Sequence, residues 1–381
     1  MIAVTAYSAS AEIVQGCPEG QQGIAAAEAA GAAAESSTPS LFQKQEVGPC
    51  QDRGAVGTCK FPIPYSWVQM CTFRQDAGGG WASYMICDEQ RQQNIVQYVR
   101  ERDVPAFKEM LQFSVCDLWP LIKGRTLWIM GDSHSYDLFH ALGCLVLPLW
   151  DYNHEGDFPY ARETEAFQHL EQHVEHYKPP ECLPLLEGTM VCQIRVNKGQ
   201  MVRDHTLPLL KRMAKPDDIA VINFAHWHNG WEGTEYRDLL QAFRDEVATD
   251  SAALPHIIWK EMVATHYRHL HGAYKGGTPP FECAPLGVSL HPNGSLTAQD
   301  DINQLIVEGG AHNKAAREVF AGSDIIMTGS WNATVELYEY HRELADGRGH
   351  ECGHYCFPGA PEIWLYYVYS AMKTAPWSAK N

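Results

Sequence analysis

Five short apolar runs, separated by segments of helical periodicity, dominate the chain beyond residue 121. The runs occupy 126–130, 190–196, 219–224, 257–262 and 325–328. Short runs that are apolar at nearly every position suit strands buried on both faces of a parallel sheet. The alternation of such strands with helices predicts an open α/β fold, in which ligands bind at the carboxyl ends of the strands.

The segments between the runs show helical spacing of apolar residues. Two sets are each expected to share one helix face: Leu138, Phe139, Leu142, Leu145 and Val146, and Leu239, Leu240, Phe243 and Val247. A third helix is expected from about Thr297 to Phe320, with Asp300 completing a weak capping box. A further helix is expected over 89–101.

The composition differs before residue 121. Residues 1–45 are rich in Ala, Glu, Gly and Ser and are expected to form a flexible leader; they lack the basic region and continuous apolar region of a signal peptide. Residues 46–120 contain Cys50, Cys59, Cys71, Cys87 and Cys116. This segment is interpreted as a loop-rich, cross-linked layer wrapped on the main domain at 121–373, with a short tail at 374–381.

Charge and cysteine content exclude some classes of protein. Lys plus Arg is 29 and Asp plus Glu is 46, which gives a formal net charge of −17. Such a chain repels phosphate backbones and acidic lipid headgroups, so we expect neither nucleic acid nor a membrane surface as a partner. No apolar stretch approaches the roughly 18 residues of a membrane span. The 12 cysteines are spread along the chain, which favours disulfides and an oxidising compartment over a zinc ribbon.

A serine follows the first predicted strand, in the tripeptide Gly131-Asp132-Ser133, which also opens a predicted helix. Ser133 is therefore expected at the carboxyl edge of the sheet. Its backbone N–H lies at a helix N-terminus, where it stabilises a developing oxyanion. The position suggests a nucleophile, and the alternative is a serine that only caps the helix.

An acid and a histidine stand three residues apart near the C-terminus, as Glu351 and His354. A nucleophilic serine needs a base, and the base needs an acceptor that fixes its tautomer. One short loop supplies both here, although a loop stapled through Cys352 and Cys356 with an exposed His354 is an alternative. Asn223, at the end of the third run, is a candidate oxyanion donor or a simple turn residue.

Taken together, these blocks resemble the SGNH/GDSL-like hydrolase superfamily, and within it the trichome birefringence-like and PC-esterase branch. The C-terminal block of that branch, D-x-x-H-W-C-x-P-G-x-P-D-x-W, is similar to Glu351-Cys-Gly-His354-Tyr-Cys356-Phe-Pro-Gly359-Ala-Pro361-Glu-Ile-Trp364. Supporting matches are Leu121-Ile-Lys-Gly-Arg125, Asn223-Phe-Ala-His226-Trp227, His266, Gly276-Gly277 and Cys283. The resemblance covers roughly residues 60–373. It implies a flavodoxin-like three-layer sandwich with a five-stranded parallel sheet, and makes 121–373 the catalytic domain.

The resemblance also implies roles for individual residues. Ser133 would be the nucleophile, His354 the base and Glu351 its carboxylate partner, while Asn223 and the Ser133 backbone would form the oxyanion hole. The substrate region would include Asp132, His134, His226, Trp227 and His266. Two positions depart from the family: Glu351 replaces an Asp, and Tyr136-Asp137 stand where Arg-Asn is usual.

Disulfides are implied by the same resemblance. It pairs Cys283 with Cys352. It also pairs Cys144 and Cys356 each with a cysteine of the N-terminal layer, among Cys59, Cys71 and Cys87.

The implied activity is O-acetylation of a cell-wall or secretory-pathway polysaccharide through an acyl-serine intermediate. Acetyl-CoA or another acetyl donor would be the co-substrate, and no bound cofactor is expected. Two alternatives are a carbohydrate esterase that uses the same residues and an inactive carbohydrate-binding relative. We expect a monomer located in the Golgi lumen or secreted.

Two histidine clusters raise a zinc hypothesis. His169, His173 and His176 have helical spacing, and His266, His269 and His271 follow the fourth run. A solvated helix face explains the first cluster better, and no metal site is expected. Asn293 and Asn332 begin glycosylation sequons, which matter only in a luminal protein.

Overall fold

The computed structural model describes residues 71, 85–151, 154, 170–172, 181–228, 234–274, 278–344 and 349–378. The leader expected over 1–45 lies outside the described residues. So do Cys59, the cluster of His169, His173 and His176, and the Gly276-Gly277 turn.

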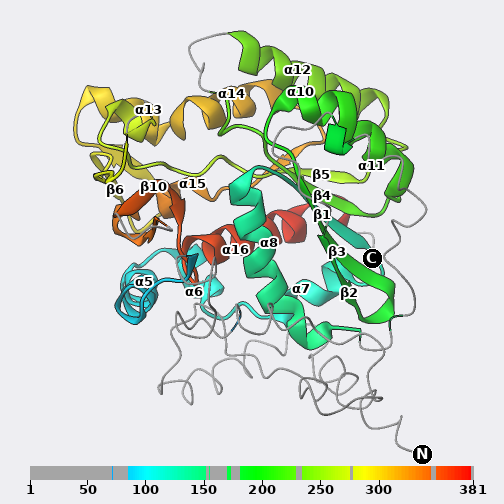
Figure 1. The fold of residues 1–381 in the computed structure, drawn as a ribbon, viewed down its shortest axis with the longest axis horizontal. Coiled ribbons are helices and arrows are strands. Elements are labelled where there is room, and N and C mark those ends of the chain that lie inside the picture. Colours follow the sequence, from blue (N-terminus) through cyan, green and yellow to red (C-terminus); the bar gives the residue numbers. More distant parts are fainter. Residues whose placement is uncertain are drawn as a thin grey trace, which may run out of the picture.

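The centre of the molecule is a six-stranded sheet in the order β2-β3-β1-β4-β5-β8 (Figure 1). The strands are β1 Thr126–Gly131, β2 Glu181–Leu185, β3 Thr189–Arg195, β4 Ile219–Ile222, β5 His256–Trp259 and β8 Ile326–Met327. All five predicted runs contribute strands, which pair in parallel in the order second, first, third, fourth, fifth. This is the flavodoxin-like order.

The sixth strand, β2, corrects the expectation of a five-stranded sheet. It pairs antiparallel with β3 at the edge, with Cys182 opposite Cys192. Its sequence contains Pro184, which cannot donate to a ladder and is tolerated on an edge strand. That proline, together with the polar Glu181, gave no strand pattern in the sequence.

Helices cover both faces of the sheet, which makes a three-layer α/β/α arrangement (Figure 1). Side chains alternate between two apolar cores. Leu127, Ile129 and Val221 join one core, and Trp128, Met130 and Ile222 join the other. The first core includes α8 (Ser133–Val146), α16 (Ala360–Thr374) and the N-terminal helices; the second includes α11 (Leu207–Met213), α12 (Thr234–Thr249) and α14 (Gly310–Phe320).

The described part of the N-terminal layer is helical, which corrects the loop-rich expectation. The helices are α5 Glu89–Glu101, α6 Pro105–Met110 and α7 Val115–Ile122. The first of these lies where sequence periodicity predicted it. Pro105 starts α6, and a capping box between Ser114 and Asp117 starts α7. Phe107 and Leu118 are fully buried in the core beside the sheet, and the boundary expected at residue 120 falls inside α7.

The single helix expected from Thr297 to Phe320 is wrong, because the chain is interrupted. Leu296–Ala298 forms β7, which pairs with β6 (Val288–Leu290). Asp300 caps a short turn, η6 (Asp301–Asn303), and α13 (Gln304–Val307) follows. Gly309 then adopts a left-handed φ of 89° before α14 begins. A glycine adopts this conformation readily and so ends one helix and permits the next.

A hairpin of β9 (His341–Glu343) and β10 (His350–Tyr355) lies outside the main sheet. The remaining short elements are η1 Leu147–Leu149, η3 Leu186–Gly188, α10 Gly199–Met201, η4 Val202–Thr206, η5 Leu270–Gly272, α15 Trp331–Thr334 and η7 Tyr338–Tyr340. Of the helices within the described ranges, none has the length and apolar character needed to cross a membrane.

Candidate active site

Ser133 is placed by a sharp turn between the central strand β1 and helix α8. The Asp132 carboxylate accepts a hydrogen bond from the His134 backbone N–H at 3.0 Å and so caps the helix. Gly131 has a φ of 151°, and a Cβ there would lie 2.3 Å from the Asn223 carbonyl oxygen. The turn therefore requires glycine and leaves Ser133 partly exposed at the carboxyl edge of the sheet.

His354 faces this serine from β10, with its Nε2 2.5 Å from Ser133 Oγ. Its Nδ1 is hydrogen-bonded to Glu351 Oε1. Because a carboxylate only accepts, Nδ1 carries the proton and Nε2 is free to accept from the serine hydroxyl. The structure thus brings Ser133, His354 and Glu351 together as a hydrogen-bonded relay.

A regular strand would not achieve this arrangement. Residues three apart on a strand point to opposite faces, yet Glu351 and His354 bond to each other. The register of β10 against β9 shifts between His350 and Tyr355. Such an irregularity re-aims side chains, and Gly353 between the two residues adds no side chain of its own.

The protonation states of His354 and Glu351 allow His354 to act as a general base. Burial lowers the pKa of His354, and the nearby Arg342 charge lowers it further, while Glu351 raises it in part. Burial raises the pKa of Glu351, but the hydrogen bonds and charges of His354 and Arg342 outweigh burial and hold the pKa well below its usual range. At neutral pH the carboxylate is therefore charged and the imidazole is neutral.

Two other histidines surround the base. The ring of His134 stacks on that of His354 at a centroid distance of 4.7 Å, and its Nε2 donates to the Gly353 carbonyl at 2.6 Å. The ring of His226 lies edge-on to His134 at 4.7 Å. Burial lowers the pKa of His226 to about 3, so it is neutral at physiological pH. Both rings therefore lie beside the base, while the Ser133 hydroxyl is hydrogen-bonded to His354.

Both polar atoms of the Asn223 side chain form hydrogen bonds with the backbone near the ends of β4 and β5. Its Nδ2 donates to the Lys260 carbonyl at 2.6 Å, and its Oδ1 accepts from the Ala225 N–H at 2.9 Å. The amide therefore bridges the ends of β4 and β5, with one Nδ2 hydrogen outside this bond. Its expected part in an oxyanion hole stays a prediction.

His266 and Trp227 occupy different surroundings. His266 is fully buried, bonded to His341 Nε2 at 2.8 Å and to the Val335 carbonyl at 2.9 Å. Its ring is linked to the base through His341, whose Nδ1 donates to the His354 carbonyl at 2.9 Å, and its backbone N–H donates to the Cys352 carbonyl at 2.8 Å. Trp227 is 36% exposed.

Two charged residues near the site were not predicted from the sequence. Arg342, on β9, binds Glu351 Oε2 through Nε at 2.9 Å. Lys260 is buried beyond β5; burial lowers its pKa to about 8, against the opposing charges of Asp132 and Asp137. Neither belongs to a motif, so only the folded chain identifies them.

Disulfides fix the segments that carry the relay. Cys283 pairs with Cys352, beside Glu351, as the resemblance implied. Cys356 pairs with Cys87 and Cys144 with Cys71, so both N-terminal partners come from the expected set.

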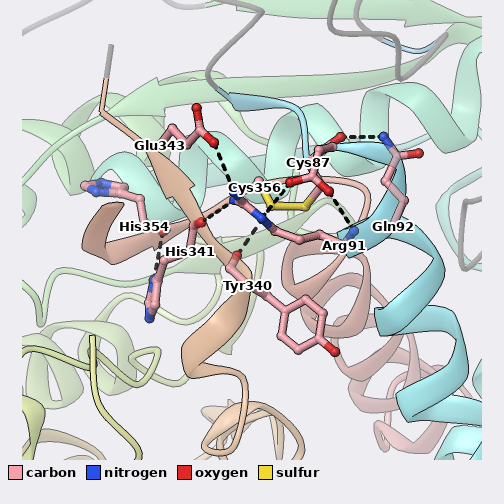
Figure 2. The surroundings of a disulfide bond; sticks show 9 residues. Cys87, Arg91, Gln92, Tyr340, His341, Glu343, His354 and Cys356 are labelled. Carbon is pink, nitrogen blue, oxygen red and sulfur yellow. Dashed lines mark hydrogen bonds and ion pairs between the residues drawn. A yellow bond between two sulfur atoms is a disulfide. The ribbon is translucent and has the colours of Figure 1, made fainter. Parts of the chain in front are cut away.

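Figure 2 shows Cys87–Cys356 beside β9, where Arg91 donates to the His341 carbonyl at 3.0 Å. The Cys182–Cys192 bond across β2 and β3 was not predicted. Disulfides of this kind are typical of oxidising compartments.

No group of His, Cys, Asp and Glu side chains within the described ranges is arranged to hold a metal ion. A pocket of about 450 Å³ is lined by Tyr267, Arg268, His269, His271, Gly272, Ala284, Pro285, Leu286, Gly287 and Asn303. Of its lining residues, Tyr267 lies close to the segment of Glu351 and His354, because a Cβ built at Gly353 would lie 3.1 Å from the Tyr267 hydroxyl.

No family model matches the chain, and no curated protein matches its sequence. Among solved structures, a mutant of an acetyl-xylooligosaccharide esterase from Geobacillus stearmophilus aligns with 66% of this chain and 96% of its own, at 10% identity and a TM-score of 0.31.

Proposed function

We propose that this chain is a serine-dependent O-acyltransferase, which moves an acetyl group to a polysaccharide hydroxyl through an ester on Ser133. The observation that carries the proposal is the relay of Ser133, His354 and Glu351, with His354 Nε2 2.5 Å from the serine oxygen. This arrangement is the one that activates a serine hydroxyl in acyl transfer.

The geometry supports the following steps. As Ser133 Oγ attacks the acetyl carbonyl, its proton moves to His354 Nε2, and Glu351 stabilises the imidazolium. His354 then gives that proton to the leaving group of the acetyl donor, which leaves an acetyl ester on Ser133. The N–H of Ser133, in the first turn of α8, and the Asn223 amide are the proposed donors to the oxyanion.

In the second half-reaction an acceptor hydroxyl loses its proton to His354 and attacks the ester carbonyl. As the bond to Ser133 Oγ breaks, His354 returns the proton to that oxygen, which restores the free serine and the neutral base. A sugar hydroxyl as acceptor makes the enzyme a transferase, and water makes it an esterase. The distinction depends on acceptor binding and on the exclusion of water.

Two features support a carbohydrate acceptor. One is the resemblance of the sequence blocks to polysaccharide O-acetyltransferases. The other is a pair of exposed aromatic side chains. Trp227, which follows His226 in the chain, is 36% exposed, and Tyr274 is 48% exposed, with its ring centroid 5.0 Å from that of Tyr267. Aromatic faces of this kind give apolar contact area with a polar edge. The disulfides support a secretory or extracellular location, in the Golgi lumen or beyond.

A fluorophosphonate probe tests the serine mechanism. Labelling of the wild type that is lost in Ser133→Ala supports it, and absence of labelling favours an inactive carbohydrate-binding protein. Incubation with an acetyl donor and xylan, pectin or mannan fragments then tests the acceptor by mass spectrometry. Acetylated oligosaccharide supports the transferase, whereas free acetate with unmodified oligosaccharide contradicts it and favours the esterase.

A further inference from the structure

The two oxygens of the Glu351 carboxylate have different partners. Oε1 accepts a hydrogen bond from His354 Nδ1. Oε2 accepts a hydrogen bond from Arg342 Nε at 2.9 Å and forms an ion pair with Arg342 Nη2, also at 2.9 Å. The Arg342 side chain is only 14% exposed and comes from β9, the strand beside β10. The guanidinium therefore holds the far side of the carboxylate that orients the base.

A glutamate needs such a restraint more than an aspartate does. Its extra methylene adds a rotatable bond, and each added torsion gives the free side chain more rotamers to lose. A guanidinium is planar and presents donors in a fixed fork, and charge-assisted bonds of this kind fix both distance and direction. Arg342 thus restrains the torsion that the longer side chain introduces.

The strand that carries Arg342 also holds the base itself. His341 Nδ1 donates to the His354 carbonyl at 2.9 Å (Figure 2). Consecutive residues of β9 therefore contact the side chain of the acid and the backbone of the histidine. The strand is anchored in turn by Arg91, which binds the His341 carbonyl and the Glu343 carboxylate at 3.0 Å each.

We propose that Arg342 is a positioning residue, which acts through Glu351 to keep His354 aimed at Ser133. The inference rests on the proposed function, because it gives Arg342 a part in that reaction. Arg342 touches no reacting atom and is not a catalytic residue.

The charge of Arg342 affects the pKa of His354, which can be measured and which a purely packing role would leave unchanged. The groups that face His354 are Ser133, Glu351 and Arg342, together with the rings of His134, His226 and His341. The Arg342 charge is the largest cause after burial that lowers the pKa of His354. Arg342→Gln removes the charge and the fork, whereas Arg342→Lys keeps the charge and loses only the fork.

The first experiment needs no activity. The ring of His354 is titrated by NMR in the wild type, Arg342→Gln, Arg342→Lys and Glu343→Gln. The last variant is the matched control, because it breaks the exposed Arg91 pair on the same strand. We expect the His354 titration to move to higher pH in Arg342→Gln, and to stay near the wild type in Arg342→Lys and Glu343→Gln. An unmoved titration in Arg342→Gln overturns the inference.

The second experiment is a double-mutant cycle of Arg342→Gln and Glu351→Gln on the hydrolysis of 4-nitrophenyl acetate. Because small misplacements of catalytic groups cost up to about 100-fold, we expect Arg342→Gln to lower kcat by about 10- to 100-fold with little change in KM. In the Glu351→Gln background it should cost less than about 3-fold. An equal loss in both backgrounds overturns action through Glu351. A wild type without Ser133-dependent labelling contradicts the proposed function instead, and the NMR titration then decides the arrangement on its own.

Discussion

His354 Nε2 lies 2.5 Å from Ser133 Oγ, although the two residues are 221 positions apart in the chain. Ser133 follows the central strand of the sheet, whereas His354 belongs to a hairpin outside it. The contact therefore depends on the links that fix the hairpin to the rest of the molecule. These links include the Cys283–Cys352 and Cys87–Cys356 disulfides and the bond from the Cys87 N–H to the Phe357 carbonyl at 2.9 Å.

Ser133→Ala should abolish fluorophosphonate labelling and lower esterase activity by at least about 1,000-fold, because residues of such a relay act as a unit. The matched control is Ser135→Ala, two residues on in the same helix, where the serine is 2% exposed. The control should still be labelled. Labelling that persists in Ser133→Ala would place the nucleophile elsewhere.

The pH dependence of kcat/KM should report the titration of His354. Burial and the Arg342 charge hold the pKa of His354 below 6.5, and only the neutral ring accepts the serine proton. Activity should therefore be retained at neutral pH and fall only as pH drops through a midpoint below 6.5. A midpoint above about pH 7 in the kcat/KM profile would contradict this environment.

Glu351→Gln should shift the acidic midpoint of the kcat/KM profile to a lower pH. The Glu351 charge raises the pKa of His354, so its removal lowers the pKa, while loss of the acceptor lowers the rate. The residual activity should show a lower midpoint than the wild type under the same buffers. A midpoint that rises would mean that the carboxylate does not interact with His354 in solution.

The parallel strands were predictable because burial on both faces leaves continuous apolar runs. Strand β3 shows this, since Val191 and Ile194 are each 1% exposed or less. Strand β2 was not predictable, because its pairing is an edge contact that a proline-containing segment makes without an apolar pattern. The break at Gly309 was equally hidden, because a glycine inside a helical pattern is compatible with a continuous helix.

The site was predictable only in part. Ser133, His354 and Glu351 carry a motif, so the sequence names them even though it does not show their distances. Arg342 and Lys260 carry none, because their importance comes from the charges that the fold brings near them. The irregularity in β10 that brings Glu351 and His354 to the same side is a property of strand pairing, which one strand's sequence does not encode.

The Cys283–Cys352 disulfide should matter more to activity than to folding. Replacing both cysteines by Ala removes a link across 69 residues and should lower the free energy of unfolding by about 2–4 kcal/mol. The matched control is the Cys182–Cys192 pair, separated by 10 residues at the far edge of the sheet. Urea denaturation and probe labelling rates are measured for both. Equal losses of labelling in the two double variants would contradict a role for Cys283–Cys352 in holding the Glu351–His354 segment.

The turn before the nucleophile gives the last prediction, through two glycines at opposite ends of β1. Both have positive φ, 151° at Gly131 and 72° at Gly124, so alanine is strained at either position. A Cβ at Gly124 meets nothing within 4 Å, and Gly124→Ala should cost only about 1 kcal/mol of unfolding free energy. A Cβ at Gly131 would lie 2.3 Å from the Asn223 carbonyl and 2.4 Å from Ser135 Oγ, so β4 or the start of α8 must shift.

Gly131→Ala should therefore cost about 3 kcal/mol or more in urea denaturation and should slow probe labelling by about 100-fold, because Ser133 moves with the helix. Gly124→Ala should label at nearly the wild-type rate, since the strand end it occupies is remote from the hydroxyl. If the two variants lose stability and labelling equally, the backbone strain common to both positions accounts for the loss. In that case the close approach of β1 to β4 is not what places the serine.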